Sequence, residues 1–101
     1  MIRSFADKNT EKVFYGEMPK GFQSELPKGF QSELFGRARR ILNRIEAAHD
    51  VTDLRVPPSM RLEKLTGDRK GFWSVRVNDQ FRITFKFKGN DAFEVKFEDY
   101  H

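Results

Sequence analysis

The chain has 101 residues, of which 38% are hydrophobic and 34% are charged, and eleven are phenylalanine. A chain of this length and apolar content is expected to form one domain with a small core, so intrinsic disorder is disfavoured. The absence of cysteine excludes disulfides, thiolate metal sites and cysteine nucleophiles, and it suits a reducing cytosol. A formal charge of +4 and a pI near 9.6 favour a polyanionic partner but do not require one.

The start of the chain and its hydropathy show no pattern of export or membrane insertion. The opening residues MIRSF are followed at once by polar residues, and no apolar run reaches the length of a membrane span. We therefore expect a cytoplasmic protein without membrane contact, in which residues 1–101 form a single domain.

The first half of the chain predicts a strand and two helices. Residues 2–5 form a short apolar stretch suited to a strand, and residues 7–10 offer N-cap candidates for a short helix that carries Val13, Phe14 and Met18. A longer helix follows, ending near residues 50–53. Its apolar residues at helical spacing are Leu34, Ala38, Ile41, Leu42, Ile45 and Ala48.

The longer helix also carries arginines on one side. Arg37, Arg40 and Arg44 share that side. A polyanion can bind such a stripe, but most arginine stripes on amphipathic helices only keep the exposed side soluble.

After two prolines at positions 57 and 58, the apolar period changes to two, which is the period of strands. Alternating runs cover residues 61–65, 72–77, 81–87 and 92–97, with turn residues between them. We predict an α+β domain in which two helices pack on one face of an antiparallel meander.

The alternation also assigns side chains to the two faces of the sheet. The residues predicted to face the helices are Trp73, Val75, Val77, Phe81, Ile83, Phe85, Phe87, Phe93, Val95 and Phe97. The residues predicted to face solvent are Ser74, Arg76, Arg82, Thr84, Lys86, Glu94, Lys96, Glu98 and Tyr100. A polar face of this kind is typical of any solvated antiparallel sheet, and its mixed charges need no ligand.

Residues 19–34 read PKGFQSELPKGFQSEL, an octapeptide and its identical copy. Two copies of eight residues are too few to build a repeat architecture. We interpret them as a tandem duplication inserted into a fold that is complete without it. Because Pro27 and Gly29 oppose one continuous helix, the extra copy is expected to loop out between the two helices. Residues 19–29 should then be irregular or weakly helical, and the long helix should begin between residues 30 and 33.

The order of these features resembles a known family. The segments that carry the resemblance are MIRSF at residues 1–5, GDRKGFWS at residues 67–74, FRITF at residues 81–85 and EDYH at residues 98–101. They are similar to HigB-type toxins, the plasmid-killer branch of the RelE superfamily, over nearly the whole chain except the duplication. The resemblance implies a RelE-like sheet with two N-terminal helices.

The same resemblance implies an activity and partners. The family members are metal-independent and cofactor-free endoribonucleases of type II toxin–antitoxin systems, which cleave mRNA in the ribosomal A site and inhibit translation. The implied partners are a HigA-type helix-turn-helix antitoxin, the ribosome and mRNA, with DNA reached only indirectly through the antitoxin.

The resemblance also implies site residues. Arg82 matches the family's phosphate-stabilising arginine, Tyr100 and His101 match its terminal catalytic pair, and Asp99 is placed to orient the imidazole. Metal-free RNA cleavage needs a deprotonated 2′-hydroxyl, a stabilised phosphate charge and a proton for the 5′-oxygen, which such side chains can supply. The auxiliary RNA and phosphate contacts expected are Arg69, Lys70, Arg76, Lys64 and Lys86. No metal ligand is expected.

Two positions depart from the family pattern. The family's histidine position is Glu63 and its lysine position is Thr66, as in GraT-like relatives. Glu63 can act as a base, or Lys64 can restore the lost positive charge, yet the two point to opposite faces of a regular strand. Two alternative functions therefore stay open: an attenuated or inactive toxin variant that binds its antitoxin without efficient cleavage, and a non-catalytic basic RNA-binding module.

Overall fold

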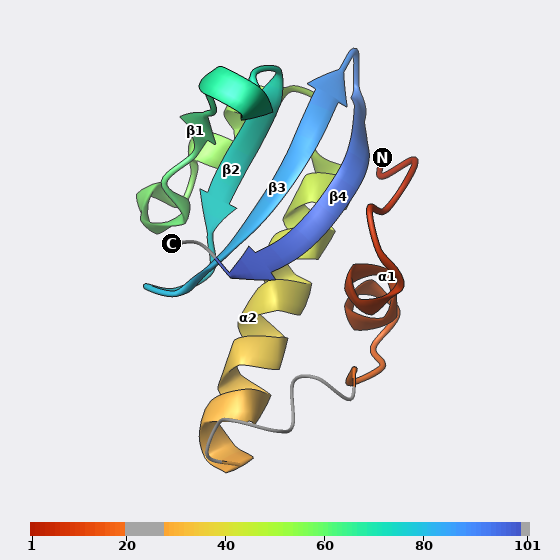
Figure 1. The fold of residues 1–101 in the computed structure, drawn as a ribbon, viewed down its shortest axis with the longest axis vertical. Coiled ribbons are helices and arrows are strands. Elements are labelled where there is room, and N and C mark those ends of the chain that lie inside the picture. The colour runs from red at the N-terminus through yellow and green to blue at the C-terminus, as the bar shows by residue number, and fades with distance from the viewer. Residues whose placement is uncertain (20–27, 100–101) are drawn as a thin grey trace.

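The computed structural model of the protein describes residues 1–19 and 28–99, and for residues 28–31 it describes the backbone alone. Within these ranges, the helices α1 (Lys8–Phe14) and α2 (Lys28–Ala47) precede the sheet (Figure 1). The strands β1 (Glu63–Lys64), β2 (Phe72–Arg76), β3 (Phe81–Lys88) and β4 (Asp91–Asp99) form an antiparallel sheet in the order β1-β2-β3-β4. The predicted α+β meander is confirmed.

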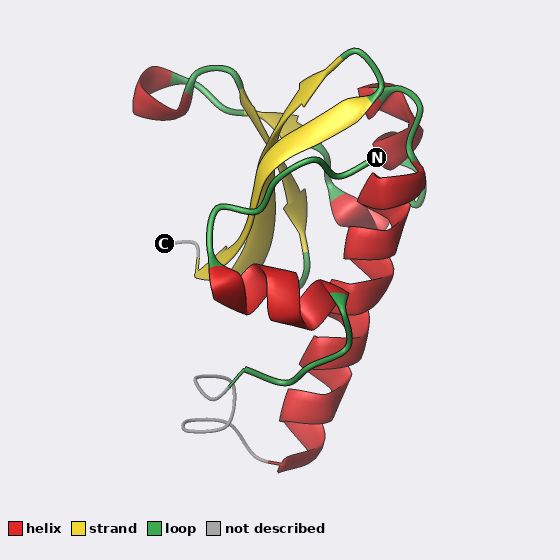
Figure 2. Cartoon of the chain, turned by 90° about the vertical axis from the view of Figure 1, so that its right-hand side faces the viewer, coloured by secondary structure: helices red, strands yellow, loops and turns green. Residues whose placement is uncertain are grey.

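Helix α2 lies on one side of the sheet, and α1 extends from the edge of the sheet at β4 toward α2 (Figure 2). The long helix α2 runs behind the strands, and α1 packs against α2 and β4. The core lies between α2 and the sheet. Its largest fully buried hydrophobic side chains are Phe85, Leu42, Ile45, Leu54, Ile83, Val13, Val75 and Val95. No helix of the described ranges is long and apolar enough to cross a membrane.

Helix α1 begins and ends where local chemistry dictates. Asp7, in an extended conformation, caps it by accepting a 2.8 Å hydrogen bond from the Thr10 amide. Gly16, with φ of 89°, follows the C-cap residue Tyr15 in the left-handed conformation that ends many helices. The prediction that Met18 belongs to this helix is therefore wrong, because the helix ends at Phe14.

Helix α2 begins at Lys28, two residues before the predicted range. Gly29 weakens a helix by only about 1 kcal/mol, so it does not prevent the second octapeptide copy from being helical. Proline is the stronger barrier, and the helix starts directly after Pro27 in the sequence. Residues 20–27 lie outside the described residues, so the looped-out extra copy stays a prediction.

Parity along β4 differs from the prediction. Phe87 lies opposite Ala92 and Lys86 opposite Phe93, but the register shifts before Ile83, which lies opposite Phe97. Glu94, with φ of 54°, marks the irregularity. The prediction that Phe93 faces the helices is therefore wrong: Phe93 shares the face of Lys86, and buried Ala92 takes the core position.

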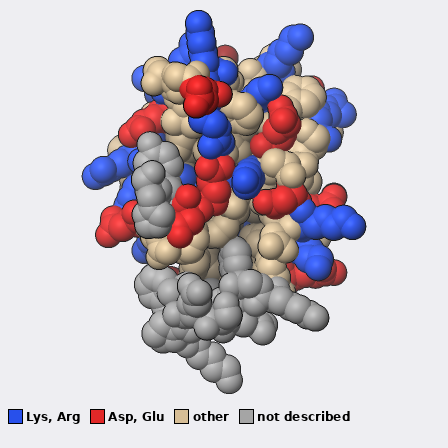
Figure 3. Space-filling view, in the orientation of Figure 1, with Lys and Arg blue, Asp and Glu red and all other residues tan. Residues whose placement is uncertain are grey.

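We call the side of the sheet turned away from α2 the open face, which is turned toward the viewer in Figures 1 and 3. Its residues, from the registers, are Glu63, Phe72, Ser74, Arg76, Arg82, Thr84, Lys86, Phe93, Lys96 and Glu98. Basic and acidic side chains are interleaved over it (Figure 3). It is thus mixed in charge rather than uniformly basic.

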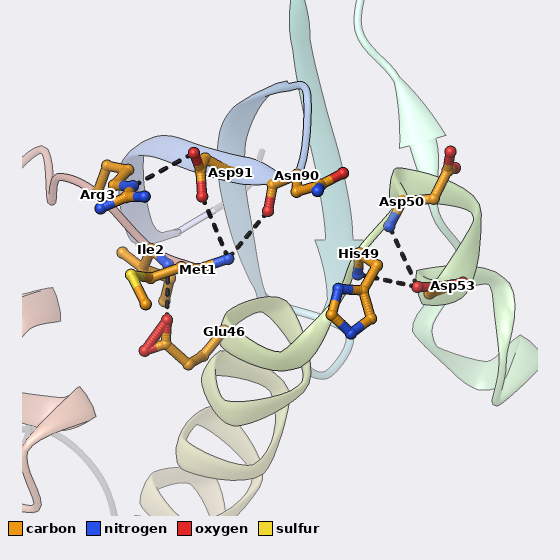
Figure 4. A network of polar contacts seen from close by, with 9 residues as sticks. All are labelled: Met1, Ile2, Arg3, Glu46, His49, Asp50, Asp53, Asn90 and Asp91. Atoms are coloured by element: carbon orange, nitrogen blue, oxygen red, sulfur yellow. Dashed lines mark hydrogen bonds and ion pairs between the residues drawn. The ribbon is translucent and has the colours of Figure 1, made fainter.

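The N-terminal segment, predicted as a strand, runs parallel to β4 but pairs with it only at two isolated bridges, Ile2 with Ala92 and Phe5 with Val95. The Ile2 amide donates a 2.8 Å hydrogen bond to Glu46 of α2, so the segment joins the edge of the sheet to the helix (Figure 4). Arg3 adds an ion pair with Asp91 at 3.3 Å (Figure 4). The predicted segment does lie beside the sheet, but it forms isolated bridges and not a continuous strand.

Candidate functional site

Arg82 is held in place on the open face. Its Nη1 donates a 3.0 Å hydrogen bond to the Ser74 hydroxyl and lies 3.8 Å from a carboxylate oxygen of Glu63. Only 14% of the Arg82 side chain is exposed, and Ser74 is buried. The prediction that Arg82 simply looks at solvent is therefore wrong, because side chains on neighbouring strands, about 4.8 Å apart, cover most of it. The Arg82 guanidinium is therefore oriented by its neighbours and mostly covered by them.

A second arginine forms a closed network beside it. Arg69, in the 3-10 turn Gly67–Arg69, donates to both carboxylate oxygens of Glu98 at 3.1 Å and to the Thr84 hydroxyl at 3.0 Å. The Thr84 hydroxyl in turn donates to Glu98 at 2.8 Å. Sequence reasoning assigned Thr84 to solvent, but it is 1% exposed beneath this network.

The network sets the charge states of its members. Burial of the Glu98 carboxylate acts to raise its pKa, but the hydrogen bonds from Arg69 and Thr84 outweigh burial, and the pKa lies below its usual value. The hydrogen bond to Glu98 also raises the pKa of Arg69. Both groups are therefore charged at neutral pH, and Arg69 is already paired within the protein.

The other predicted phosphate contacts fall into different places. Lys86 lies on the open face, 3.0 Å from Glu94 and 5.0 Å from the Phe72 ring. Arg76 lies directly opposite Arg82 and pairs with Asp79 in the turn between β2 and β3. Lys70 is exposed, next to Arg69 in the chain.

Lys64 is separated from this group. It pairs in register with Trp73, and its ammonium lies 5.8 Å from the Trp73 ring. Trp73 packs against the core, so Lys64 is on the helix side of the sheet. Glu63 instead shares the open face with Arg82. Of Glu63, the possible base, and Lys64, the possible replacement for the lost positive charge, the structure brings only Glu63 to Arg82.

The end of β4 lies next to Arg82. Glu98 is directly opposite Arg82, and Asp99 is opposite Phe81, where it accepts a 3.1 Å hydrogen bond from the Gln80 side chain. Asp99 therefore lies on the opposite face of the sheet from Arg82 at this last pair. Tyr100 and His101 lie outside the described residues, so their catalytic roles stay predictions.

Sequence reasoning missed the supporting residues Ser74, Thr84 and Glu98, which orient the two arginines. The alternation along the strands already placed these three residues on the same face as Arg82. Ser74 and Thr84, which lie opposite each other, are small and leave room for guanidinium groups to lie across them. Within residues 1–19 and 28–99, no group of three or more His, Asp or Glu side chains could hold a metal ion.

The small antiparallel sheet with two N-terminal helices is a fold found in solved toxin structures. The same fold occurs in a chain of the YoeB–YefM complex from Staphylococcus aureus. The structural match covers 100% of this chain and 98% of the matched chain, with a TM-score of 0.56 at 16% identity. The family described as the RelE-like toxin of type II toxin–antitoxin system HigB matches residues 3–101. The chain therefore belongs to the HigB-like toxins.

Two relatives agree with this membership. Endoribonuclease HigB of Proteus vulgaris is 35% identical over 101 residues, which is 100% of both proteins. Toxin HigB-1 of Vibrio cholerae serotype O1 is 46% identical over 48 residues, which is 48% of this chain and 50% of that protein.

Proposed function

We propose that this toxin is an endoribonuclease that cleaves mRNA in the A site of the translating ribosome, and that a HigA-type antitoxin neutralises it in the cytoplasm. The observation that carries the proposal is the Arg82 guanidinium, held by buried Ser74 directly beside the last pair of β3 and β4. The full-length similarity to a protein named an endoribonuclease supports the activity. The fold shared with a toxin–antitoxin complex supports a protein partner.

In this proposal Arg82 stabilises the negative charge that develops on the scissile phosphate. A guanidinium has five N–H donors, so Arg82 can keep its bond to Ser74 while a phosphate oxygen takes the place of Glu63. Glu63 is half exposed and is then released within reach of the substrate. It is our candidate for the base that takes the proton of the 2′-hydroxyl.

The end of the chain completes the proposed chemistry. Tyr100 and His101 deliver the proton to the 5′-oxygen leaving group. Asp99 faces away from Arg82 and accepts a hydrogen bond from Gln80, so it is not among the proposed reacting groups. Glu63 and Thr66, which stand at the family's histidine and lysine positions, support placing this toxin in a GraT-like branch. Contacts with DNA are proposed only through the antitoxin.

The test is Arg82→Ala, assayed by mRNA cleavage on purified translating ribosomes. Deleting one charge-stabilising donor should lower the cleavage rate by about 10²–10³-fold. Arg82→Lys should recover little of this, because an ammonium cannot hold Ser74 and a phosphate in one plane. Arg55→Ala, at an exposed arginine of the 3-10 turn Val51–Arg55, is the control and should cleave at the wild-type rate.

The variant must be shown to be folded, because removing the donor to a buried hydroxyl can cost about 1–3 kcal/mol of unfolding free energy. A folded Arg82→Ala variant that cleaves at the wild-type rate would remove Arg82 from the site. A wild-type protein that binds its antitoxin but does not cleave on ribosomes would establish the attenuated toxin instead.

A further inference from the structure

A groove of about 340 Å³ lies at the side of the domain, between α2, the 3-10 turn Pro58–Met60 and the end of β2. Its basic lining residues are Arg37, Arg40, Arg44 and Arg76. Its other lining residues are Ile41, Pro57, Ser59, Met60 and Val77. No carboxylate lines the groove among the residues that the structure describes, which distinguishes it from the mixed charges of the open face.

The sequence places these guanidinium groups together. Arg37, Arg40 and Arg44 are three and four residues apart, so they follow one side of α2. The turn before β1 packs against β2 and closes the opposite wall. Like charges four residues apart destabilise a helix slightly, so Arg40 and Arg44 cost stability in the isolated protein. An anion in the groove would reverse that cost.

The four arginines are not equally engaged. Arg37 pairs with Glu33 at 3.5 Å and Arg76 pairs with Asp79, and both of these carboxylates line the neighbouring hollow rather than this groove. Arg40 and Arg44 are exposed, and neither forms an ion pair within the described part of the chain. These two side chains offer the groove its uncompensated positive charge.

The chemistry of the groove favours a phosphate backbone over a peptide. Its apolar lining residues Ile41, Met60 and Val77 are buried, so the groove offers little apolar surface to the large side chains that anchor peptides. Planar guanidinium groups bind phosphate oxygens in pairs and need no such anchor.

Position connects the groove to the open face. Arg76 lines the groove and lies directly opposite Arg82 in the register of β2 and β3. We propose that the groove binds the phosphate backbone of the single-stranded RNA whose scissile phosphate lies at Arg82, at nucleotides beyond the cleaved bond. This inference rests on the proposed function and adds a second contact surface for the substrate.

The test measures binding of labelled single-stranded 2′-O-methyl RNA, which lacks the nucleophilic hydroxyl, by fluorescence anisotropy over a salt series. Oligonucleotides of about 4 and about 16 nucleotides span the usual range of single-strand site sizes. The variant is Arg40→Gln with Arg44→Gln. The control, Lys12→Gln with Arg39→Gln, removes the same charge from exposed positions on α1 and α2 that do not line the groove.

The groove variant should bind the long oligonucleotide more weakly. The slope of log affinity against log salt is negative, and its magnitude should decrease by about 1.4, or about 0.7 for each lost phosphate contact. Binding of the short oligonucleotide should change little. Equal slopes for groove variant and control would overturn the proposal. Should the double variant fail to fold, each single substitution is expected to lower the magnitude of the slope by about 0.7.

Two further outcomes separate this inference from its alternatives. If the groove variant binds RNA like the wild type but loses affinity for purified antitoxin, the groove binds protein and the proposal is wrong. If the wild type binds the long oligonucleotide through the groove but cleaves no mRNA on ribosomes, the groove stands and the proposed function fails. In the ribosome assay the groove variant should raise KM with little change in kcat, because it touches no reacting atom.

Discussion

Replacing Arg69 by methionine tests whether this arginine acts mainly within the protein. The substitution keeps a long apolar stem but removes the paired bonds to Glu98 and the bond to Thr84. Hydrogen bonds to charged groups contribute about 1.5–3 kcal/mol, and exposed ion pairs about 0–1 kcal/mol. Arg69 is 42% exposed and Glu98 17%, so solvent screening reduces the effect. We expect the unfolding free energy to fall by about 1–2 kcal/mol.

Urea unfolding followed by circular dichroism measures this loss, and the melting temperature should fall by about 4–8 °C for each kcal/mol. Arg3→Met is a matched control, because Arg3 pairs with Asp91 at a more exposed site, 54% and 28% exposed. Its loss should stay below about 0.5 kcal/mol. Glu98→Gln completes a double-mutant cycle, in which the two losses should not add.

The pH dependence gives an independent check with a definite sign. The folded-state pKa of Glu98 lies below its ordinary value of 4.5, so its stabilising contribution is present above that value and is lost as pH falls through the folded-state pKa. The difference in stability between wild type and Arg69→Met should therefore be largest near pH 7 and shrink as the pH falls below 4.5. A difference that is absent at pH 7, or unchanged at low pH, would refute the reasoning.

Three further predictions concern other parts of the chain. Removing Tyr100 and His101 should abolish mRNA cleavage on ribosomes and lower the melting temperature little, because terminal residues bury little surface; surviving activity would show that the family's terminal pair does not operate here. Deleting residues 20–27 joins buried Pro19 to Lys28 and leaves a single octapeptide copy. The deletion should change the unfolding free energy by less than about 1 kcal/mol, and it should raise cleavage activity if the extra copy attenuates the toxin. A larger loss of unfolding free energy would mean that the fold needs the longer connection. Glu94→Gly should be at least as stable as wild type in urea unfolding, because φ of 54° strains a residue with a side chain by roughly 1–2 kcal/mol. Glu94→Val should be less stable than wild type. Equal stability of the two variants would show that this backbone is unstrained.

Much of this protein could be predicted from the order of its residues. The apolar period of 3.6 along α2 and the period of two along β2 and β3 predicted the helix, the strands and the side of the sheet that they bury, because burial follows directly from periodicity. The motif segments around Arg69 and Arg82 predicted the family, which the match over residues 3–101 confirms. The charge pattern likewise predicted a stripe of arginines on α2.

Only the tertiary structure decided how the candidate site residues are arranged. The irregularity at Glu94 moves Phe93 to the open face, and no sequence period reveals it, because a bulge depends on how two strands align. Pairing of β1 with β2 places Glu63 beside Arg82 and Lys64 on the other side. The partners of Arg69 and Arg82 come from other strands, and the hydrogen-bond partners are 8 to 29 residues away in the sequence. A side chain's face follows from local geometry, whereas its partners follow from strand register, and register is a property of the folded sheet.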